Sequence, residues 1–151
     1  MVIKEIDFDT ICLIWKEKLW PSRFSPIETH SAMMYQSNFY DAGNFLLPVW
    51  YIGCYDDNDE LIGVNSGHMC VDGLARSRGL WVCPKKRQNG HGKQLLLATI
   101  EQARHNKARG IWSFPRKSSD RVYKSAGFTI TSEWQQSETS EANAYCYMDL
   151  I

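Results

Sequence analysis

Residues 82–93 read VCPKKRQNGHGK, and this stretch decides how the fold of the chain is interpreted. A β-rich run (75–83) precedes it, and a helical run (about 90–106) follows with Leu96, Ile100 and Ala103 on one face. The first turn of a helix has backbone N–H groups without partners, and glycine lets such groups approach an anion closely. The stretch therefore predicts a strand–loop–helix unit that holds a diphosphate.

The glycine pattern by itself is weak evidence, because many G-x-G sequences are ordinary tight turns. The dinucleotide fingerprint G-x-G-x-x-G is absent, since Leu95 stands where the third glycine would be, and no Walker A loop is present. The order of the features makes the prediction stronger: a strand, a proline, a basic loop, two glycines and an apolar helix.

The distribution of charge along the chain also favours an anion site. The chain carries 17 Lys/Arg and 17 Asp/Glu, but residues 76–127 hold 13 basic and 2 acidic residues, a net charge of +11. Residues 1–75 have a net charge of −7 and residues 128–151 a net charge of −4. This pattern indicates an anion site built from the middle of the chain, unless folding interleaves the segments and leaves no basic surface.

Apolar periodicity and turn residues predict alternating elements in the order β α (α) β β β α β α β β. The predicted strands are residues 2–6, 49–55, 61–70, 75–83, 111–114, 128–134 and 145–150. The predicted helices are residues 8–19, about 27–40, about 90–106 and 118–126, and residues 135–143 are predicted to form an exposed loop. We therefore expect the chain to form one mixed α/β domain over residues 1–151.

Several classes of protein are excluded at this stage. No run approaches about 18 apolar residues, so no membrane-spanning helix is expected. The N-terminus, MVIKEIDFDT, has acidic residues where a signal peptide has an apolar stretch. Five cysteines without a C-x-x-C pair, and four histidines that do not pair with them at ligand spacing, predict reduced thiols in a cytoplasmic protein without a metal site.

The chain resembles the GNAT superfamily of acyl-CoA-dependent N-acyltransferases. Three motifs carry the resemblance: Arg87-x-x-Gly90-x-Gly92, Leu80-x-Val82-x-Pro84 and the run 122–128, VYKSAGF. The first matches the acyl-CoA pyrophosphate signature of the family at every defined position. The resemblance implies an α/β (α+β mixed) domain with a splayed, mostly antiparallel central sheet of six to seven strands and about four helices.

The resemblance also implies acetyl-CoA (coenzyme A) as the acyl donor. The residues that would contact it are Leu80, Trp81, Val82, Arg87, Gln88, Asn89, Gly90, His91, Gly92, Lys93 and Arg116. Arg116 stands where family members often have an asparagine, so the usual contact cannot be assumed there. Lys85 and Lys86 either meet phosphate charge or are simply solvated.

Tyr123 matches the usual general acid of the family, since a phenol with a pKa of about 10 is protonated at neutral pH and can protonate a leaving thiolate. The alternative is a ring packed in the core. The strand before the loop has no carboxylate to act as a base, which departs from many family members. His68 and Asp72, on or after the preceding strand, are the best substitutes, although a lone histidine is more often structural. Arg76 and Arg78 share a strand face and suggest a substrate with a carboxylate or phosphate, unless that face is simply exposed.

The predicted function is therefore acetyl-CoA-dependent transfer of an acetyl group to a primary amine by direct attack in a ternary complex. The acceptor is a small-molecule or protein amine. A non-catalytic acyl-CoA-binding regulatory module is the alternative, because the strand carboxylate is missing. A nucleic-acid binder is disfavoured, since no motif that reads nucleic acid is present, and no membrane partner is expected. Both a monomer and a homodimer remain open.

Overall fold

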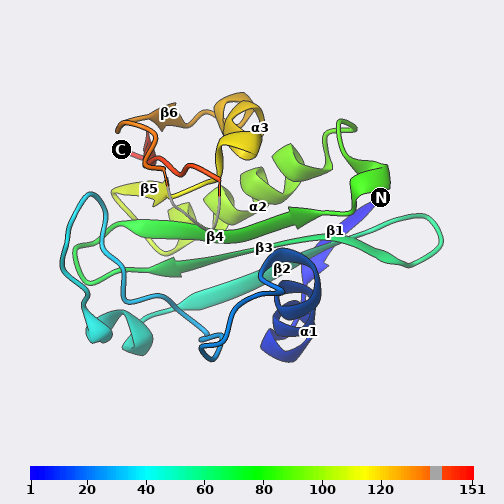
Figure 1. Cartoon of the computed structure of the whole chain (residues 1–151), viewed down its shortest axis with the longest axis horizontal. Helices are drawn as coiled ribbons and strands as arrows, with labels where there is room; N and C mark the ends of the chain where they lie inside the picture. The colour runs from blue at the N-terminus through cyan, green and yellow to red at the C-terminus, as the bar shows by residue number, and fades with distance from the viewer. Residues whose placement is uncertain (137–140) are drawn as a thin grey trace.

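The computed structural model describes residues 1–136 and 141–151, and these form a seven-stranded sheet in the order β1-β2-β3-β4-β5-β7-β6 (Figure 1). Neighbouring strands are antiparallel except for β4 and β5, which are parallel and are connected through a helix. The strands are β1 Val2–Glu5, β2 Val49–Tyr55, β3 Leu61–Met69, β4 Ala75–Val82, β5 Gly110–Ser113, β6 Thr129–Ile130 and β7 Cys146–Asp149.

The sheet opens between its two parallel strands. β4 pairs with β5 only at Ala75–Ile111 and Arg76–Trp112. From Ser77 to Val82, β4 has no strand partner on the β5 side, while its other edge remains paired with β3. The two strands therefore diverge in a V, with its vertex just beyond Arg76 and its open end at the loop that follows Val82.

A β-bulge interrupts β4 inside this opening. Val64 pairs with Trp81 and Ser66 with Arg78, so β4 places two residues opposite one residue of β3. The bulge contains Gly79, whose φ of +79° is costly for any residue with a Cβ. A Cβ at Gly79 would also lie 2.3 Å from Nε1 of a tryptophan, Trp15. Glycine is required here for both reasons.

Three α-helices lie on the two faces of the sheet (Figure 1). α1 (Phe8–Ile14) is capped by Asp7, whose carboxylate accepts from the Thr10 N–H at 2.8 Å, and it continues into a π-helical turn, η1 (Trp15–Leu19). α2 (His91–His105) and α3 (Asp120–Ser125) cover the opposite face. The short 3₁₀ turns are η2 (Ala42–Leu46), η3 (Pro84–Lys86) and η4 (Lys117–Ser119).

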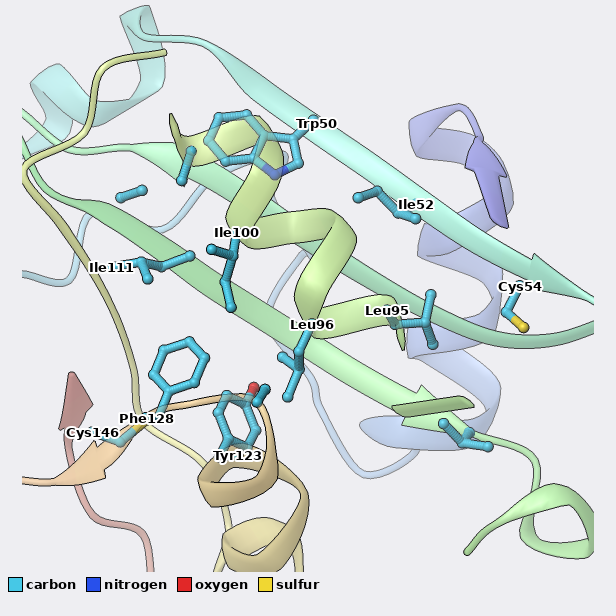
Figure 2. Packing of buried hydrophobic residues seen from close by; sticks show 14 of the residues in the cluster. Trp50, Ile52, Cys54, Leu95, Leu96, Ile100, Ile111, Tyr123, Phe128 and Cys146 are labelled. Carbon is cyan, nitrogen blue, oxygen red and sulfur yellow. The ribbon is translucent and has the colours of Figure 1, made fainter. Parts of the chain in front are cut away.

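Each face of the sheet has its own apolar core. Beneath α2 and α3, Leu95, Leu96 and Ile100 pack against Ile52 and Ile111 (Figure 2). On the other face, α1 and η1 pack through Ile11 and Trp15 against Tyr51, Val64 and Trp81. A third cluster, around Trp112 and Tyr145, lies beneath residues 33–35. The sheet is thus sandwiched along most of its length, as an α/β layered fold requires.

The sequence predicted most of this fold, including the number of strands and the mostly antiparallel sheet. The predicted helix at 27–40 is wrong, so the described residues form three α-helices where about four were expected. Side-chain and long-range backbone bonds take the place of helical ones there: the Asp41 N–H donates to the Ala32 carbonyl at 2.7 Å, and Asn44 Nδ2 donates to the Ser31 carbonyl at 3.0 Å. The strand expected at 128–134 is reduced to β6. Part of the predicted loop 135–143, residues 137–140, lies outside the described residues.

Candidate active site

The glycine-containing loop connects β4 to α2 at the open end of the V. Its start is fixed by two bonds: the Cys83 N–H donates to the Ile62 carbonyl at 2.7 Å, and Arg87 Nε donates to the Val82 carbonyl at 2.8 Å. The loop then turns through two left-handed residues, Gln88 with φ 65° and Gly90 with φ 83°. Gly90 is the N-cap residue of α2, so the loop ends directly at a helix N-terminus.

This loop presents a row of backbone donors. The N–H groups of residues 88–93 have no hydrogen-bond acceptor within residues 1–136 and 141–151, and the first α2-type bond is from the Gln94 N–H to the Gly90 carbonyl. A Cβ built on Gly90 would meet no atom within 4 Å. Unpaired donors, open space and the positive end of a helix dipole together fit a diphosphate.

The remaining predicted loop residues have distinct environments. Gly92 lies against α3, where a Cβ would be 3.0 Å from Val122 Cγ2, so it lets the two helices pack closely. His91 Nδ1 is 3.0 Å from the Met1 sulfur. Asn89 Nδ2 donates to two loop carbonyls, which holds the turn together, and Lys93 is exposed on the first turn of α2.

Tyr123 projects from α3 into the core (Figure 2), and its hydroxyl lies between Ser77 of β4 and Ser113 of β5. Its hydroxyl lies 3.2 Å from Ser113 Oγ on β5 and 3.5 Å from Ser77 Oγ on β4. The ring packs edge-on against Phe128, with the centroids 5.1 Å apart. The residue is only 3% exposed, so the phenol sits between the diverging strands and away from bulk water.

The direction of the hydrogen bonds around Tyr123 follows from its neighbours. Ser113 Oγ donates to the Ser77 carbonyl at 2.7 Å, and Asn65 Nδ2 donates to Ser77 Oγ at 2.9 Å. The arrangement that uses every donor therefore has the phenol donating to Ser113 Oγ and accepting from the Ser77 hydroxyl. Burial raises the pKa of Tyr123 to about 12, against the opposing effect of these two hydroxyls. The phenol is fully protonated at neutral pH.

His68 is engaged at both ring nitrogens. Its Nδ1 lies 3.0 Å from the Met69 carbonyl and must donate, so Nε2 accepts the Ser31 N–H at 3.2 Å. The side chain is 1% exposed, and burial lowers its pKa to about 3. These contacts give His68 the properties of a neutral structural histidine without a free lone pair.

Arg76 and Arg78 share the β4 face opposite α2, as predicted, but their environments differ. The Arg78 guanidinium lies over Trp15 and Trp20, at 4.9 and 5.3 Å from the ring centroids, and donates to the Glu28 carbonyl at 3.0 Å. The Arg76 guanidinium lies over Trp112 at 4.8 Å, and in the described part of the chain it has no hydrogen-bond acceptor.

The other residues predicted to contact coenzyme A divide between the two faces. Leu80 and Val82 point to the core beneath α2, and Trp81 points to the core beneath α1. Arg116 donates from Nη2 to the Leu19 carbonyl at 3.0 Å, which ties it to the end of η1 and not to the glycine loop.

Sequence reasoning missed Ser77 and Ser113, whose hydroxyls contact the Tyr123 hydroxyl, and Asn65, which donates to Ser77 Oγ. The only signal was the presence of small polar residues on strands that are otherwise apolar, and that signal does not say which residues meet. Within residues 1–136 and 141–151, no three His, Cys, Asp or Glu side chains are grouped to hold a metal ion, and no helix is long and apolar enough to cross a membrane.

A parallel strand pair that opens beside a glycine loop agrees with the family of acyl-CoA-dependent N-acyltransferases that the sequence motifs resemble. A model of the acetyltransferase (GNAT) family matches residues 13–128, and the chain belongs to this family. A search among curated proteins gave no significant match.

Solved structures with the same fold are distant in sequence. An aminoglycoside 6′-N-acetyltransferase complexed with coenzyme A has a TM-score of 0.70 at 11% identity, with 100% of this chain and 98% of that chain covered. A GNAT-family acetyltransferase from Staphylococcus aureus Mu50 has a TM-score of 0.67 at 14% identity, covering 99% of each chain. A Bacillus subtilis acetyltransferase in complex with CoA has a TM-score of 0.57 at 23% identity, covering 68% of this chain and 78% of that chain. At these identities the likeness establishes the fold.

Proposed function

We propose that this protein is an acetyl-CoA-dependent N-acetyltransferase that transfers an acetyl group to a primary amine by direct attack in a ternary complex. One observation carries the proposal. The unpaired N–H groups of residues 88–93 and the Tyr123 hydroxyl lie at the two ends of the same opening between β4 and β5. A long thioester matches this arrangement, because its diphosphate can lie at the N–H groups while its reactive carbonyl lies near the Tyr123 hydroxyl.

The residues present fit coenzyme A. The N–H groups of residues 88–93 would hold the diphosphate, with the exposed Lys85 and Arg87 adding positive charge beside it. The edge of β4 from Leu80 to Val82 would lie along the arm, since β5 does not pair with it. Two of the solved neighbours, complexed with coenzyme A, support this reading. When bound, acetyl-CoA supplies the activated acetyl thioester.

Tyr123 would hold a proton where the thiolate leaves. Because its pKa is raised to about 12, the phenol is a weak acid that stays protonated until negative charge develops on a neighbouring atom. The Ser77 hydroxyl, which can donate to the phenolic oxygen, would stabilise the charge on Tyr123 until the proton that the nitrogen loses as the amide forms restores the phenol. Burial of the phenol strengthens both interactions by excluding water.

The chain offers no carboxylate on β4 to deprotonate the amine, and both ring nitrogens of His68 already make hydrogen bonds. The acceptor would enter as the free amine after losing its proton to water. Acceptors with a low ammonium pKa are then favoured, and kcat/KM should rise with pH until the acceptor pKa is reached. Positioning of the two reactants supplies the rest of the rate enhancement.

Thermal unfolding with and without acetyl-CoA tests the donor site. A ligand at 100 times its Kd adds about 2.7 kcal/mol, which is a shift of about 5–11 °C for a domain of this size. We expect the wild type to shift and Gly90→Glu not to shift, because the new carboxylate occupies the anion position. Gly90→Ala is the matched control, since it carries the same strain at φ 83° without the charge. A silent wild type would contradict the proposal.

Turnover then separates an enzyme from a non-catalytic acyl-CoA-binding module. Release of the coenzyme A thiol is followed with a panel of small amines and a lysine peptide. We expect thiol release that depends on the amine and falls in Tyr123→Phe. Binding of acetyl-CoA without amine-dependent release would favour the module. Five free thiols agree with a cytoplasmic setting, where this donor is available.

A further inference from the structure

Arg76 is a half-buried guanidinium without a polar partner. Its Nε is fully buried and makes no hydrogen bond, and neither Nη atom has an acceptor in the part of the chain that the structure describes. Its guanidinium lies over the face of the Trp112 ring, with Cζ 4.8 Å from the ring centroid. Buried charges in proteins are normally paired, because desolvation of an unpaired charge is expensive.

The groups around Arg76 do not supply the missing negative charge. Those that act on it electrostatically are the Cys70 thiol and the phenols of Tyr123, Tyr145 and Tyr40. Burial raises the pKa of Cys70 and of Tyr123 to about 12, so both are neutral at physiological pH. Burial also lowers the pKa of Arg76 itself, as expected for a cation that has lost water without gaining an anion.

Arg78 shows that this is not a general property of the strand. It lies two residues further along the same face, is 6% exposed, and has both a carbonyl acceptor and two indole rings. Its contacts are made by residues 15–28, which close over it. The fold gives Arg78 a carbonyl acceptor and two indole faces, whereas Arg76 has no hydrogen-bond acceptor in the part of the chain that the structure describes.

We propose that Arg76 binds a carboxylate of the acceptor, so that the acceptor is a primary amine carrying a carboxylate, as an amino acid does. This inference rests on the proposed function. One guanidinium matches one monoanion, and its planar edge offers two parallel donors to a carboxylate while Trp112 covers a face. The position fits, because the Arg76 guanidinium is close enough to the Tyr123 phenol for the two groups to interact electrostatically.

The surroundings favour an acceptor with an apolar or aromatic body. Trp112 packs with Tyr35 and Tyr145, with ring centroids 5.8 Å apart in both pairs. Tyr40, which acts on the Arg76 charge, is 74% exposed at the edge of this cluster. Phenyl-bearing probes are therefore the appropriate first choice.

Binding is measured by tryptophan fluorescence and calorimetry with phenylacetate and phenylacetamide, a pair that differs in charge and little in shape. We expect phenylacetate to bind the wild type at least ten times more tightly than the amide. Arg76→Gln should lose about 10- to 150-fold in phenylacetate affinity, the range for a lost hydrogen bond to a charged group, and change little toward the amide. Equal affinity of the wild type for both probes would overturn the proposal.

The Tm of the variants is a second measurement, and it would fall in Arg76→Gln if Arg76 had only a structural role. We expect Arg76→Gln to keep or raise the Tm, because it removes an unpaired charge, whereas Arg78→Gln, the control on the same face, lowers the Tm. An equal loss in both variants would mean that Arg76 serves the fold, against the proposal.

Turnover of L-phenylalanine and L-phenylalaninamide then connects the carboxylate site to the reaction. We expect the acid to have the lower KM in the wild type and to lose that advantage in Arg76→Gln. Phenylacetate binding that depends on Arg76, in a protein that acetyl-CoA does not stabilise, would mean that the proposed function fails while the carboxylate site stands.

Discussion

The two faces of the sheet are organised in opposite ways. On the face of α2 and α3, the candidate donor site is built from backbone groups within one short stretch, residues 83–93. On the face of α1, the candidate acceptor site is built from side chains that come from five separate segments. Those segments are η1, residues 20–40, β4, β5 and β7.

This difference has a physical reason. A diphosphate is the same in every reaction of this kind, and backbone N–H groups at a helix N-terminus bind it without depending on side-chain identity. An acceptor is recognised by particular side chains, so its site changes with the residues that reach it. The V between β4 and β5 connects the two faces, and Tyr123 occupies its vertex.

Tyr123→Phe tests the point where the two faces meet, and we expect the largest effect there. Loss of a general acid typically costs about 10²- to 10⁴-fold in kcat. The acetyl-CoA-dependent rise in Tm should be retained, because the glycine loop is unchanged. In the wild type, the pKa of about 12 predicts no loss of activity from Tyr123 ionisation between pH 7 and 10. An alkaline limb near pH 9 that disappears in Tyr123→Phe would contradict the pKa assignment.

We expect Trp15→Ala to lower the stability of the protein through the acceptor face and to leave acetyl-CoA binding intact. Trp15 is fully buried, donates from Nε1 to the Gly79 carbonyl at 2.8 Å, and covers the Arg78 guanidinium. Truncation of such a residue costs about 3–5 kcal/mol, or about 6–20 °C in Tm for this size. Acetyl-CoA should still raise the Tm of the variant. Leu96→Ala, in the core beneath α2, is the comparison variant. If acetyl-CoA no longer raised the Tm of Trp15→Ala, the two faces would not be independent.

The same contrast explains what the sequence could predict. The bounds of β2 were predicted correctly, and α2 and the glycine loop were placed within a residue or two, because their signals are local. Residues 27–40 were wrongly predicted as helical, since their conformation depends on partners such as Leu47, which the His30 ring contacts at 2.8 Å. The different environments of Arg76 and Arg78 could not be predicted either. Trp15, Trp20 and Glu28 contact Arg78 only because the tertiary fold brings them to it.

His68 provides a pH-dependent test of the acceptor face. The pKa of His68 is about 3 in the folded protein, against an ordinary value of 6.5. Between pH 6.5 and 3 the imidazole therefore takes up a proton in the unfolded chain but stays neutral in the folded protein. The stabilisation is therefore complete above pH 6.5 and is lost as pH falls toward 3, at about 1.4 kcal/mol per pH unit. His68→Gln, which keeps an acceptor for the Ser31 N–H, should show a shallower pH dependence in urea unfolding between pH 4.5 and 6.

The activity of His68→Gln decides whether this residue is also a base. If His68 is structural, the pH profile of kcat/KM keeps its shape in the variant and follows the acceptor amine. An acidic limb between pH 6 and 7 that vanishes in the variant would instead assign proton transfer to His68, and the pKa of about 3 would then be wrong.

Arg116→Ala should have the smallest effect, and it tests which face this residue serves. The sequence predicted a cofactor contact, whereas the guanidinium donates to the Leu19 carbonyl at the end of η1. Loss of that bond should cost about 1–2 kcal/mol of unfolding free energy and leave the Kd of acetyl-CoA within twofold. Arg87→Ala is the matched variant, because Arg87 is bonded to Val82 inside the donor loop and its loss should weaken acetyl-CoA binding. A tenfold rise in Kd in Arg116→Ala would assign the residue to the donor site, and the donor and acceptor faces would then not be independent at this residue.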